Sequence, residues 1–554
     1  MELSGAELLV RMLEAQGVQT VAGIPGGAAL PIYDALGQSK LVHHVLTRHE
    51  QGAGFLAQGI ARASGKVGVC LASSGPGATN LITAIADAKL DSIPLVCITG
   101  QVASSLIGTD AFQEVDTYGL SIPVTKHNYL VHDARDLPRI ISDAFRIAQS
   151  GRPGPVWIDI PKDVQLQRFT LEAIPEAAKP DPAPALDLDA IERAAALINS
   201  ARRPVLYLGG GVVASGASDL AIELAERASL PTTLTLMALG AMPCEHPLAM
   251  GMLGMHGARH TNYALQEADL LICVGARFDD RATGKTQQFC PHARVIHIDI
   301  DASEIDKIIA THIGIRGDVG AALRELLPRI ERQGREAWLE RVAGLKAEHP
   351  LRLPGIDDPL SHYGLVRAVA DCLDDEAIIA TDVGQHQMWV AQAYPFRRPR
   401  QWLTSGGLGT MGFGLPAAIG AALAEPQRKV VCFSGDGSLM MNIQEMATAV
   451  DEGVDVKIVL MDNQSLGLVH QQQDMFYGKR IFAADYTRAV DFVRIAEGFG
   501  LSSIDLSACS DPRASLAQAL ASPGPGLIRC AIDVNQKVYP MVPPGAANTE
   551  MIGG

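Results

Sequence analysis

The stretch VVCFSGDGSLMMNIQEMATAVDEGVDVKIVLMDN, residues 430–463, carries the pattern that decides the fold. An apolar run ends in a Gly-Asp-Gly turn, a helix-forming segment follows, and a second apolar run ends at Asp462 and Asn463. Runs of Val, Ile and Leu that alternate with helices are typical of parallel strands buried on both faces. We therefore expect a strand–helix–strand unit of a doubly wound sheet here.

The same alternation recurs in the two earlier thirds of the chain. Residues 67–100 predict a buried strand, a Gly-Pro-Gly turn, a helix and another buried strand, and residues 204–237 repeat this order around a triple-glycine turn. Two proline-rich segments without a helical period, 172–189 and 346–362, separate the thirds. We therefore expect an α/β protein with three doubly wound parallel-sheet domains. Their expected ranges are 1–170, 190–345 and 360–545.

Composition and charge narrow the class of protein. The chain has 554 residues, 47% hydrophobic and 19% charged, which describes an ordinary globular interior. Its formal net charge of −15, with no run of basic residues, argues against nucleic-acid binding. No two of the nine cysteines have metal-ligand spacing, so we expect buried, reduced thiols. The first 17 residues predict a capped helix rather than a signal peptide, and no apolar run approaches the ~18 residues of a membrane span. We expect a soluble, cytoplasmic protein with no membrane partner.

Polar side chains follow two neighbouring strands of the predicted third sheet. Asp436 lies in the Gly-Asp-Gly turn after one strand, and Asn463 follows the next strand, 27 residues later. Adjacent parallel strands end at the same edge of a sheet, so the two side-chain oxygens should lie close together. A carboxylate, an amide oxygen and a backbone carbonyl suit a hard cation that also binds phosphate oxygens. The flanking glycines let the backbone approach a diphosphate at the following helix.

A lone carboxylate, Glu50, stands in RHEQGAGFLAQG (48–59), at the start of small and apolar residues that predict a helix. Charged side chains are rarely buried unless something specific pairs with them. The residues alone leave two interpretations open. Glu50 is either a helix-start residue favoured by the helix dipole or a carboxylate that serves a reaction.

Together these motifs resemble those of thiamine-diphosphate-dependent enzymes. The Asp436 and Asn463 pattern is similar to the superfamily's signature for magnesium and the cofactor diphosphate. Glu50 resembles the glutamate that these enzymes place against the aminopyrimidine ring of the cofactor. The resemblance implies that Glu50 exchanges a proton with a ring nitrogen, in a poorly hydrated cleft between subunits. It therefore implies a homodimer or a higher oligomer, with each site built from two chains.

A closer resemblance, to the catalytic subunit of acetohydroxyacid synthase (acetolactate synthase), covers essentially the whole chain. The stretches that carry it are GIPGGA (23–28), SSGPGATNL (73–81), GTDAFQEVD (108–116), SGRPGPVWIDIPKDV (150–164), GMLGMHG (251–257), GARFDDRATGK (275–285), TDVGQHQMW (381–389), GLGTMGFGLPAAIG (407–420) and VPPGAANTEM (542–551). The resemblance implies that the three domains bind the pyrimidine, FAD and the diphosphate with Mg²⁺, in that order.

Carried over position by position, the resemblance assigns roles to individual residues. Arg281 would hold the carboxylate of the incoming 2-ketoacid, a task suited to a bidentate guanidinium, and Met411 would support the bent cofactor. The implied catalytic positions are Glu50, Gln113, Gly26, Phe112, Lys162 and Arg281. The implied thiamine-diphosphate positions are Glu50, Ser74, Asn80, Gln385, His386, Gly409, Met411, Gly435, Asp436, Gly437, Ser438, Asn463 and Gly467. The implied metal positions are Asp436, Asn463 and, through its carbonyl, Ser465.

The middle domain contains only part of a dinucleotide fingerprint. Its LGGG turn after a strand could cradle a phosphate, and VIHIDIDASE ends a strand in acids that could meet ribose hydroxyls. These residues alone favour the alternative, a degenerate nucleotide domain that spaces its neighbours, over an FAD site. The resemblance favours FAD, without a redox role in the main reaction. The implied FAD positions are Arg152, Gly209, Gly210, Leu253, His256, Gly275, Ala276, Arg277, Asp279, Asp299, Ile300 and Asp318.

Two departures from the family pattern are informative. The superfamily often has Asn before the metal-binding Asn, where this chain has Asp462. Many relatives carry tryptophan and methionine where Gln472 and Leu468 stand, and that tryptophan favours 2-ketobutyrate as the second substrate. Gln472 in the HQQQ run instead resembles the bacterial isozyme I type, which discriminates little. One methylene in an apolar pocket is worth roughly 1–3 kcal/mol, so we expect weak preference for 2-ketobutyrate.

The resemblance implies acetolactate synthesis, the first common step toward valine, leucine and isoleucine. Pyruvate is decarboxylated and its two-carbon unit joins a second pyruvate, or 2-ketobutyrate to give 2-aceto-2-hydroxybutyrate. The alternatives are another thiamine-diphosphate carboligase, decarboxylase or oxidase, such as glyoxylate carboligase, which lacks the glutamate, or pyruvate oxidase. A non-catalytic homologue would be expected to lose Glu50, Asp436 or Asn463. A small regulatory subunit is also implied, by the resemblance alone.

Overall fold

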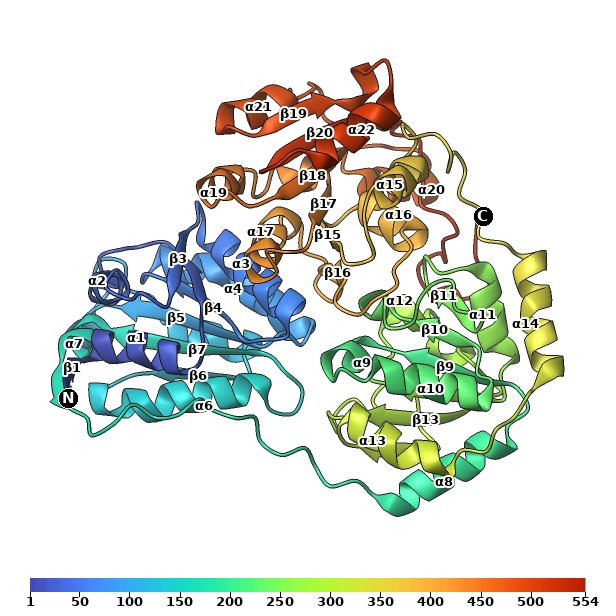
Figure 1. The fold of residues 1–554 in the computed structure, drawn as a ribbon, viewed down its shortest axis with the longest axis horizontal. Coiled ribbons are helices and arrows are strands. Elements are labelled where there is room, and N and C mark those ends of the chain that lie inside the picture. The colour runs from blue at the N-terminus through green and yellow to red at the C-terminus, as the bar shows by residue number, and fades with distance from the viewer. Residues whose placement is uncertain (554) are drawn as a thin grey trace. The chain divides into compact units, whose positions relative to one another are not determined.

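The computed structural model describes residues 1–553 and contains three six-stranded parallel sheets flanked by helices, so the predicted fold class is confirmed (Figure 1). The N-terminal sheet has the order β3-β2-β4-β5-β7-β6, the central sheet β11-β10-β9-β12-β13-β14, and the C-terminal sheet β16-β15-β17-β18-β20-β19. In each sheet the strand order reverses near the middle, which opens a crevice at the carboxyl ends of the strands.

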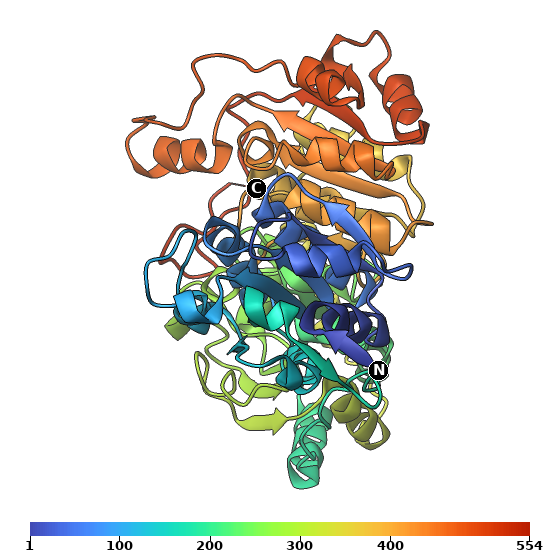
Figure 2. The ribbon, with the colours of Figure 1, turned by 90° about the vertical axis from the view of Figure 1, so that its left-hand side faces the viewer.

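The N-terminal sheet is covered on both faces. Helices α1, α2 and α6 pack on one face, and α3 and α4 pack on the other. Figure 2 shows this part of the chain toward the viewer, with the N terminus marked beside the dark-blue α1. Helix α1 begins with the predicted cap, because Ser4 and Glu7 form a reciprocal capping box. The elements are β1 Glu2–Ser4, α1 Gly5–Ala15, β2 Thr20–Gly23, α2 Leu30–Leu36, β3 His43–Leu46, α3 Glu50–Ser64, β4 Gly68–Ala72, α4 Pro76–Leu90, β5 Leu95–Gln101, α5 Thr117–Ser121, β6 His127–Leu130, α6 Leu137–Gln149, β7 Pro155–Pro161, α7 Lys162–Leu166 and β8 Arg168–Thr170.

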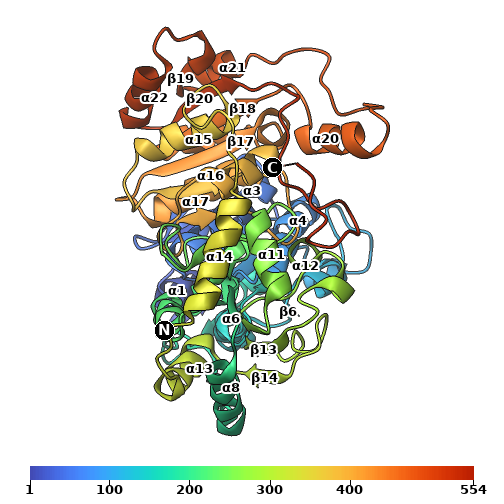
Figure 3. The ribbon, with the colours of Figure 1, turned by 90° about the vertical axis from the view of Figure 1, so that its right-hand side faces the viewer.

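The central sheet has the same doubly wound form. Figure 3 shows two of its covering helices, α11 and α14, side by side, and Trp338 of α14 donates its indole N–H to the carbonyl of Pro204. The elements are α8 Leu188–Ser200, β9 Pro204–Leu208, α9 Gly210–Ala214, α10 Ser218–Ala228, β10 Thr232–Leu234, β11 Ala249–Met252, α11 Arg259–Glu267, β12 Leu270–Val274, α12 Asp280–Thr283, β13 Arg294–Asp299, β14 Ile313–Arg316, α13 Val319–Leu326 and α14 Glu336–Glu348.

The C-terminal sheet contains the stretch quoted first. Its apolar runs form β17 and β18, which are neighbouring parallel strands, as the pattern predicts. The elements are α15 His362–Asp371, β15 Ile378–Thr381, α16 Gln385–Ala393, β16 Trp402–Leu403, α17 Gly414–Ala424, β17 Val430–Gly435, α18 Asp436–Leu439, α19 Glu445–Asp451, β18 Val456–Asp462, α20 Gly467–Phe476, α21 Phe492–Phe499, β19 Ser502–Asp505, α22 Pro512–Ala521 and β20 Gly526–Ala531.

Contacts between residues divide the chain into two compact units. The first unit contains the N-terminal and C-terminal sheets, and the second contains the central sheet. The first unit is built from residues 1–182, 377–386 and 403–531. The second is built from residues 183–376 and 387–402 and from the chain after residue 531. The first unit is therefore discontinuous in sequence, and its two sheets share one hydrophobic core.

Two glycines allow helices α3 and α17 to meet at backbone level inside the first unit. A Cβ on Gly59 would overlap the carbonyl of Ala417, and a Cβ on Gly420 would overlap the carbonyl of Leu56. These positions require glycine because the facing atoms are backbone and cannot move aside. The contact joins the N-terminal sheet's helix layer directly to that of the C-terminal sheet.

The structure corrects one expectation from composition. None of the nine cysteines forms a disulfide within residues 1–553, but Cys244 and Cys372 are exposed rather than buried. Burial was predicted from apolar strand runs, and these two lie outside strands, Cys244 in a loop and Cys372 at the end of α15. Within residues 1–553, no helix combines the length and the apolar character needed to span a membrane.

Candidate active site

Glu50 is the first residue of α3, as the sequence predicts, and His49 caps the helix by accepting from the Gln51 amide. The carboxylate is half-buried, and its Oε2 accepts a hydrogen bond of 2.9 Å from Asn80 Nδ2. Gly77 lies beside it, since a Cβ there would be 3.6 Å from Glu50 Oε1. Thus α3 and α4 together present a carboxylate and an amide at one edge of the N-terminal sheet.

Three turns gather around this carboxylate. A Cβ on Gly26 would lie 2.5 Å from Ser73 Cβ, and a Cβ on Gly75 would lie 2.9 Å from Gln113 Cα. Gln113 itself has φ of 59°, a left-handed conformation that non-glycine residues rarely adopt. The structure therefore brings the predicted positions Gly26, Ser74 and Gln113 to the same sheet edge as Glu50.

Two further predicted catalytic positions of the first unit lie at its surface. Phe112 is 87% exposed, and Lys162 begins α7 with a half-buried side chain. A phenylalanine exposed to this degree buries almost no apolar area in the single chain. Phe112 therefore has the exposure expected at the entrance of a site rather than in a core.

The start of α3 is anchored by a residue that sequence analysis missed. Glu445, at the start of α19, is fully buried and accepts from the Arg48 amide at 3.1 and 3.3 Å. Thr448 Oγ1 donates to the same carboxylate at 2.7 Å. Burial raises the pKa of Glu445, while these donors oppose the rise. Arg48 precedes Glu50 by two residues, so its contact with Glu445 fixes the position of the start of α3 and of the Glu50 side chain.

Asp436 and Asn463 follow the adjacent strands β17 and β18, as predicted. Asn463 Oδ1 accepts from the Ser465 amide at 3.2 Å, and its Nδ2 donates to Gln385 Oε1 at 3.1 Å. Gly467 is required beside them, because a Cβ there would overlap Gln385 Oε1. The predicted positions Asp436, Asn463, Ser465 and Gln385 therefore converge.

Asp436 is buried in a way that is costly without a cation. Burial, and then the neighbouring Asp462 carboxylate, raise the pKa of Asp436 to about 7. Asp462 is itself neutralised by Arg529, whose Nε lies 2.8 Å from Asp462 Oδ2. This explains the departure from the usual Asn at position 462: the extra carboxylate is paired within the chain. The donor set around Asp436, a carboxylate with amide and carbonyl oxygens, fits Mg²⁺.

His386 has the features of a diphosphate contact. The ring is buried, its Nε2 has no hydrogen-bond partner in residues 1–553, and burial lowers its pKa to about 3. A Cβ on Gly435 would lie 2.9 Å from His386 Nδ1, so the ring packs on the turn of β17. Buried polar atoms are normally satisfied, so an unsatisfied neutral imidazole here fits a bound polar group. Gln385, next to it, donates to Gln471 Oε1 at 3.0 Å.

The remaining turn positions close this edge of the C-terminal sheet. Ser438 Oγ accepts from the Gly435 amide at 3.2 Å, and a Cβ on Gly437 would lie 2.6 Å from the hydroxyl of Tyr486. Helix α18, which begins at Asp436, is only four residues long. The glycine turn is thus held by side chains rather than by a long helix.

The predicted cofactor-supporting residues lie on an irregular loop between β16 and α17. Gly409 is exposed with φ of 67°, and Met411 is half-buried. The end of the loop is fixed by Gly412, whose amide donates to Asp382 Oδ1 at 2.8 Å and whose carbonyl accepts from Asn442 Nδ2 at 2.7 Å. The loop therefore has a defined conformation without regular secondary structure.

The two predicted specificity positions lie on α20, which projects from the C-terminal sheet in Figure 3. Gln472 is exposed and Leu468 is half-buried, whereas the neighbouring Gln471 is buried against Gln385. Of the HQQQ run, it is therefore Gln471 that reaches the interior of the chain. Gln472 faces solvent in the single chain.

In the second unit, the triple-glycine turn is tighter than a phosphate cradle requires. The Gly209 amide donates to Val274, and the Gly211 amide donates to Gly275. A Cβ on Gly209 would overlap the Gly275 carbonyl, so these glycines also permit close packing of two strand ends. Nearby, Thr235 Oγ1 is buried without a hydrogen-bond partner in the described chain, which fits a polar ligand at this edge.

The acids predicted to bind FAD take part in backbone hydrogen bonds. Asp279 caps α12 and Asp318 caps α13, while Asp299 Oδ1 accepts from the Asp301 amide at 2.9 Å. An ionised carboxylate has about four acceptor positions, so a carboxylate that caps a helix can also accept from a ligand. Leu253 and Ala276 are buried, and Gly210, His256, Gly275, Arg277 and Ile300 are half-buried. Arg152, in the first unit, donates to Ser92 Oγ at 2.8 Å.

Arg281, the predicted ketoacid-binding residue, lies in α12 of the second unit. Its side chain is 68% exposed, and its nearest carboxylate, on Asp280, is 3.9 Å away. A contact of this length on the surface contributes little, so the guanidinium is not committed to a strong intrachain pair.

Comparisons with known proteins find relatives over almost the whole length of this chain. Three family models match: the thiamine pyrophosphate enzyme N-terminal TPP binding domain over residues 3–120, the central domain over 191–326 and the C-terminal TPP binding domain over 382–530. The acetolactate synthase isozyme 1 large subunit of Escherichia coli (strain K12) is 66% identical over 550 residues, 99% of this chain and 98% of that protein. Its isozyme 2 large subunit is 48% identical over 99% of both chains. Acetolactate synthase 1, chloroplastic, of Oryza sativa subsp. japonica is 46% identical over 99% of this chain and 87% of that protein.

Proposed function

The chain belongs to the acetolactate synthases, a family of thiamine pyrophosphate enzymes, and on that premise we propose how its residues divide the work. The enzyme makes acetolactate from pyruvate, a step of branched-chain amino acid biosynthesis. The observation that carries the proposal is the meeting of Asp436, Asn463 and Gln385 beside the unsatisfied His386 Nε2. We propose that these residues hold the diphosphate of thiamine diphosphate with Mg²⁺.

Bound thiamine diphosphate supplies the electron sink for decarboxylation and carbon–carbon bond formation. The chain supplies acid–base chemistry and orientation. The Glu50 carboxyl would serve as the acid–base group toward the aminopyrimidine ring of the cofactor, and Asn80 holds that carboxyl in place by its 2.9 Å hydrogen bond. Met411 would support the bound cofactor from its loop, and Arg281 would bind the carboxylate of the second ketoacid.

FAD is proposed for the carboxyl edge of the central sheet. Supporting features are the buried Thr235 hydroxyl, which has no partner in the described chain, and the acids Asp299 and Asp318 at the same edge. FAD has a structural rather than a redox role here. The absorbance of purified protein reports its presence directly, and apoprotein that binds no added FAD would contradict the assignment.

Product analysis tests the function as a whole. Purified chain receives thiamine diphosphate, Mg²⁺, FAD, pyruvate and 2-ketobutyrate together. Acetolactate and 2-aceto-2-hydroxybutyrate are the expected products. Acetaldehyde or acetate without either acid would instead favour a decarboxylase or an oxidase of the same superfamily.

The variant Gln472→Trp tests the preference for the second ketoacid. We expect the wild-type enzyme to prefer 2-ketobutyrate only weakly. An indole at this exposed position of α20 adds apolar contact for one methylene, worth roughly 1–3 kcal/mol, or about 10-fold or more in competition. The ratio of the two products, measured with both ketoacids present, gives the result. Gln473→Trp, one residue along α20, is the control, and equal shifts in both variants would contradict a specific role for Gln472.

We propose that each active site is shared between two chains, with Glu50 from one chain and Asp436 from the other. We expect Glu50→Gln and Asp436→Asn subunits to be inactive separately and to regain activity when mixed and allowed to exchange. In a mixed dimer, one of the two sites then combines an intact Glu50 with an intact Asp436. Half of the dimers are mixed, so about a quarter of wild-type activity should return. If mixing restores nothing while subunit exchange is demonstrated, each site lies within one chain.

A small regulatory subunit is proposed as a further partner. The closely similar Escherichia coli proteins are named as large subunits, which implies a smaller companion. Co-purification with a small subunit from the same source tests this directly, and activity that does not respond to that subunit would argue against a regulatory role.

A further inference from the structure

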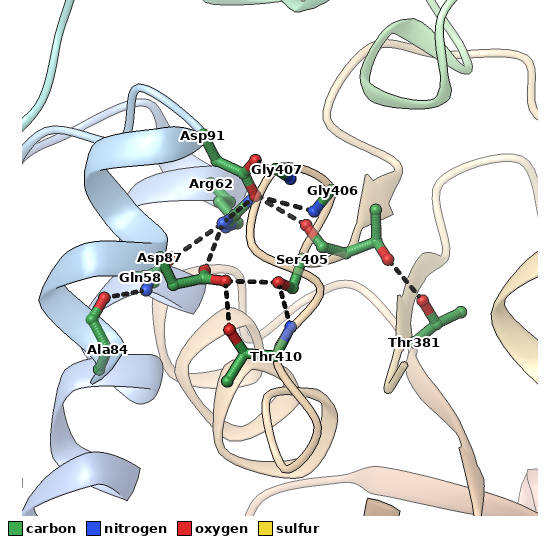
Figure 4. Close-up of polar contacts among 11 residues, drawn as sticks. Gln58, Arg62, Ala84, Asp87, Asp91, Thr381, Ser405, Gly406, Gly407 and Thr410 are labelled. Atoms are coloured by element: carbon green, nitrogen blue, oxygen red, sulfur yellow. Dashed lines mark hydrogen bonds and ion pairs between the residues drawn. The ribbon is translucent and has the colours of Figure 1, made fainter. Parts of the chain in front are cut away.

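The loop that carries Gly409 and Met411 has little rigidity of its own. Its sequence from residue 404 to 412 is TSGGLGTMG, with four glycines among nine residues. Glycine loses more conformational freedom on ordering than any other residue, so such a loop needs external contacts to hold one conformation. Those contacts come from α3 and α4, on the other sheet of the first unit (Figure 4).

Asp87 of α4 binds the side chains of the loop. Its Oδ1 accepts from Ser405 Oγ in a short hydrogen bond and from Thr410 Oγ1 at 2.9 Å, while Ser405 Oγ accepts from the Thr410 amide at 2.8 Å. The carboxylate has no exposed surface. Burial and the nearby Asp91 raise the pKa of Asp87, whereas Arg62 and the two loop hydroxyls lower it. The loop donors therefore help to keep the buried carboxylate charged.

Asp91, at the end of α4, binds the backbone of the loop. It accepts from the Gly406 amide at 3.0 Å and from the Gly407 amide at 2.7 Å. Figure 4 shows both aspartates reaching the loop from the same helix, with Arg62 between them. Four hydrogen bonds thus join one turn of α4 to a segment more than 310 residues away in sequence.

Arg62 of α3 connects the two carboxylates with the two ends of the loop. Its guanidinium lies 3.2 Å from Asp87 and 2.8 Å from Asp91, and it donates to the Thr404 carbonyl at 2.9 Å. The same group lies over the Phe413 ring, 4.9 Å from its centroid. The beginning and the end of the loop therefore share one anchoring side chain.

We propose that Arg62, Asp87 and Asp91 are positioning residues that hold the Met411 loop in its cofactor-supporting conformation. Helices α3 and α4 also carry Glu50 and Asn80 near their N-terminal ends. The same pair of helices therefore positions both the Glu50 carboxylate and the Met411 loop. In a dimer with shared sites, the loop and Glu50 of one chain face different cofactors. The proposal rests on the proposed role of Met411, and its test includes a variant of that residue.

The sharpest variant is Thr410→Val, which removes one hydroxyl donor to Asp87 and keeps the side-chain shape. We expect thiamine diphosphate affinity, measured by titration in the presence of Mg²⁺, to fall about 10-fold, as supporting contacts around a bound group typically do. The near-ultraviolet circular dichroism of the bound cofactor should change, and Thr410→Ser should restore both. Thr125→Val is the matched control, since that buried hydroxyl donates to Ser121 away from the loop.

Each outcome supports or contradicts the proposed role of the cluster in holding the Met411 loop. If Thr410→Val lowers the unfolding temperature but leaves cofactor affinity and dichroism unchanged, the cluster is only structural and the proposal is wrong. If Met411→Ala also leaves both readouts unchanged, the role of Met411 fails first. Asp87→Asn is the stronger perturbation, but it leaves Arg62 short of a buried partner and threatens folding. The test therefore uses the conservative variants Thr410→Val and Thr410→Ser, together with Ser405→Ala.

Discussion

Replacing Glu50 by glutamine is expected to slow pyruvate turnover by about 10²–10⁴-fold, the usual contribution of a positioned acid–base group. Glutamine has nearly the same shape and can still accept from Asn80, but it cannot exchange a proton with the aminopyrimidine ring. The residue begins α3 and makes its side-chain hydrogen bond to Asn80, so the fold should persist.

The measurement separates this role from binding. Hydrogen–deuterium exchange at C2 of the bound cofactor should slow with turnover, while the Kd for thiamine diphosphate changes little. Glu452→Gln, which alters a carboxylate paired with His43, is the control and should behave as wild type. A Glu50→Gln enzyme that exchanges C2 hydrogen at the wild-type rate would show that the carboxylate does not activate the cofactor.

Asp436→Asn is expected to weaken Mg²⁺-dependent binding of thiamine diphosphate by at least about 100-fold. The anionic oxygen is the strongest ligand that the chain offers to the cation. The stability of the apoprotein should not fall, because the change removes a buried charge that lies close to Asp462. Loss of ligand binding without loss of apoprotein stability is the signature of a ligand rather than of a structural residue.

Calorimetric titration of the cofactor at several Mg²⁺ concentrations measures the first effect, and thermal unfolding with and without cofactor measures the second. Asp462→Asn is a demanding control. It alters a neighbouring buried carboxylate and restores the superfamily's usual Asn, so Mg²⁺-dependent affinity should stay near wild type. Equal losses in both variants would refute the distinction between the ligand and its neighbour.

The strand pattern was sufficient to predict the fold and half of the candidate site. Parallel strands that are adjacent in a sheet end at one edge, so the positions of Asp436 and Asn463 after β17 and β18 followed from their spacing. The start of α3 at Glu50 also followed from local pattern. In each case the functional atom lies within a residue or two of the strand or helix end that places it.

The anchoring residues could not be predicted in the same way. The Arg48–Glu445 contact joins positions 397 apart, and no helical periodicity marks the pair, because Arg48 lies in the bend before α3. The choice between Gln471 and Gln472 depends on where α20 begins after an irregular turn, a matter of helix phase. The triple-glycine turn at 209–211 was interpreted as a possible phosphate cradle, but its contact with Gly275 shows that it also serves packing. Such roles depend on tertiary partners rather than on sequence spacing.

Because the first unit is discontinuous in sequence, its two halves are synthesised at different times. Residues 1–182 leave the ribosome long before residues 403–531, which supply α17 and the other half of their shared core. At the usual rate of translation, the interval between residue 182 and the end of α17 at Ala424 is roughly 10–50 s. During it, Leu56 and the rest of the α3 surface lack their covering helix and are exposed to other nascent chains. Slower synthesis of the intervening segment therefore lengthens the time for which this apolar surface is exposed.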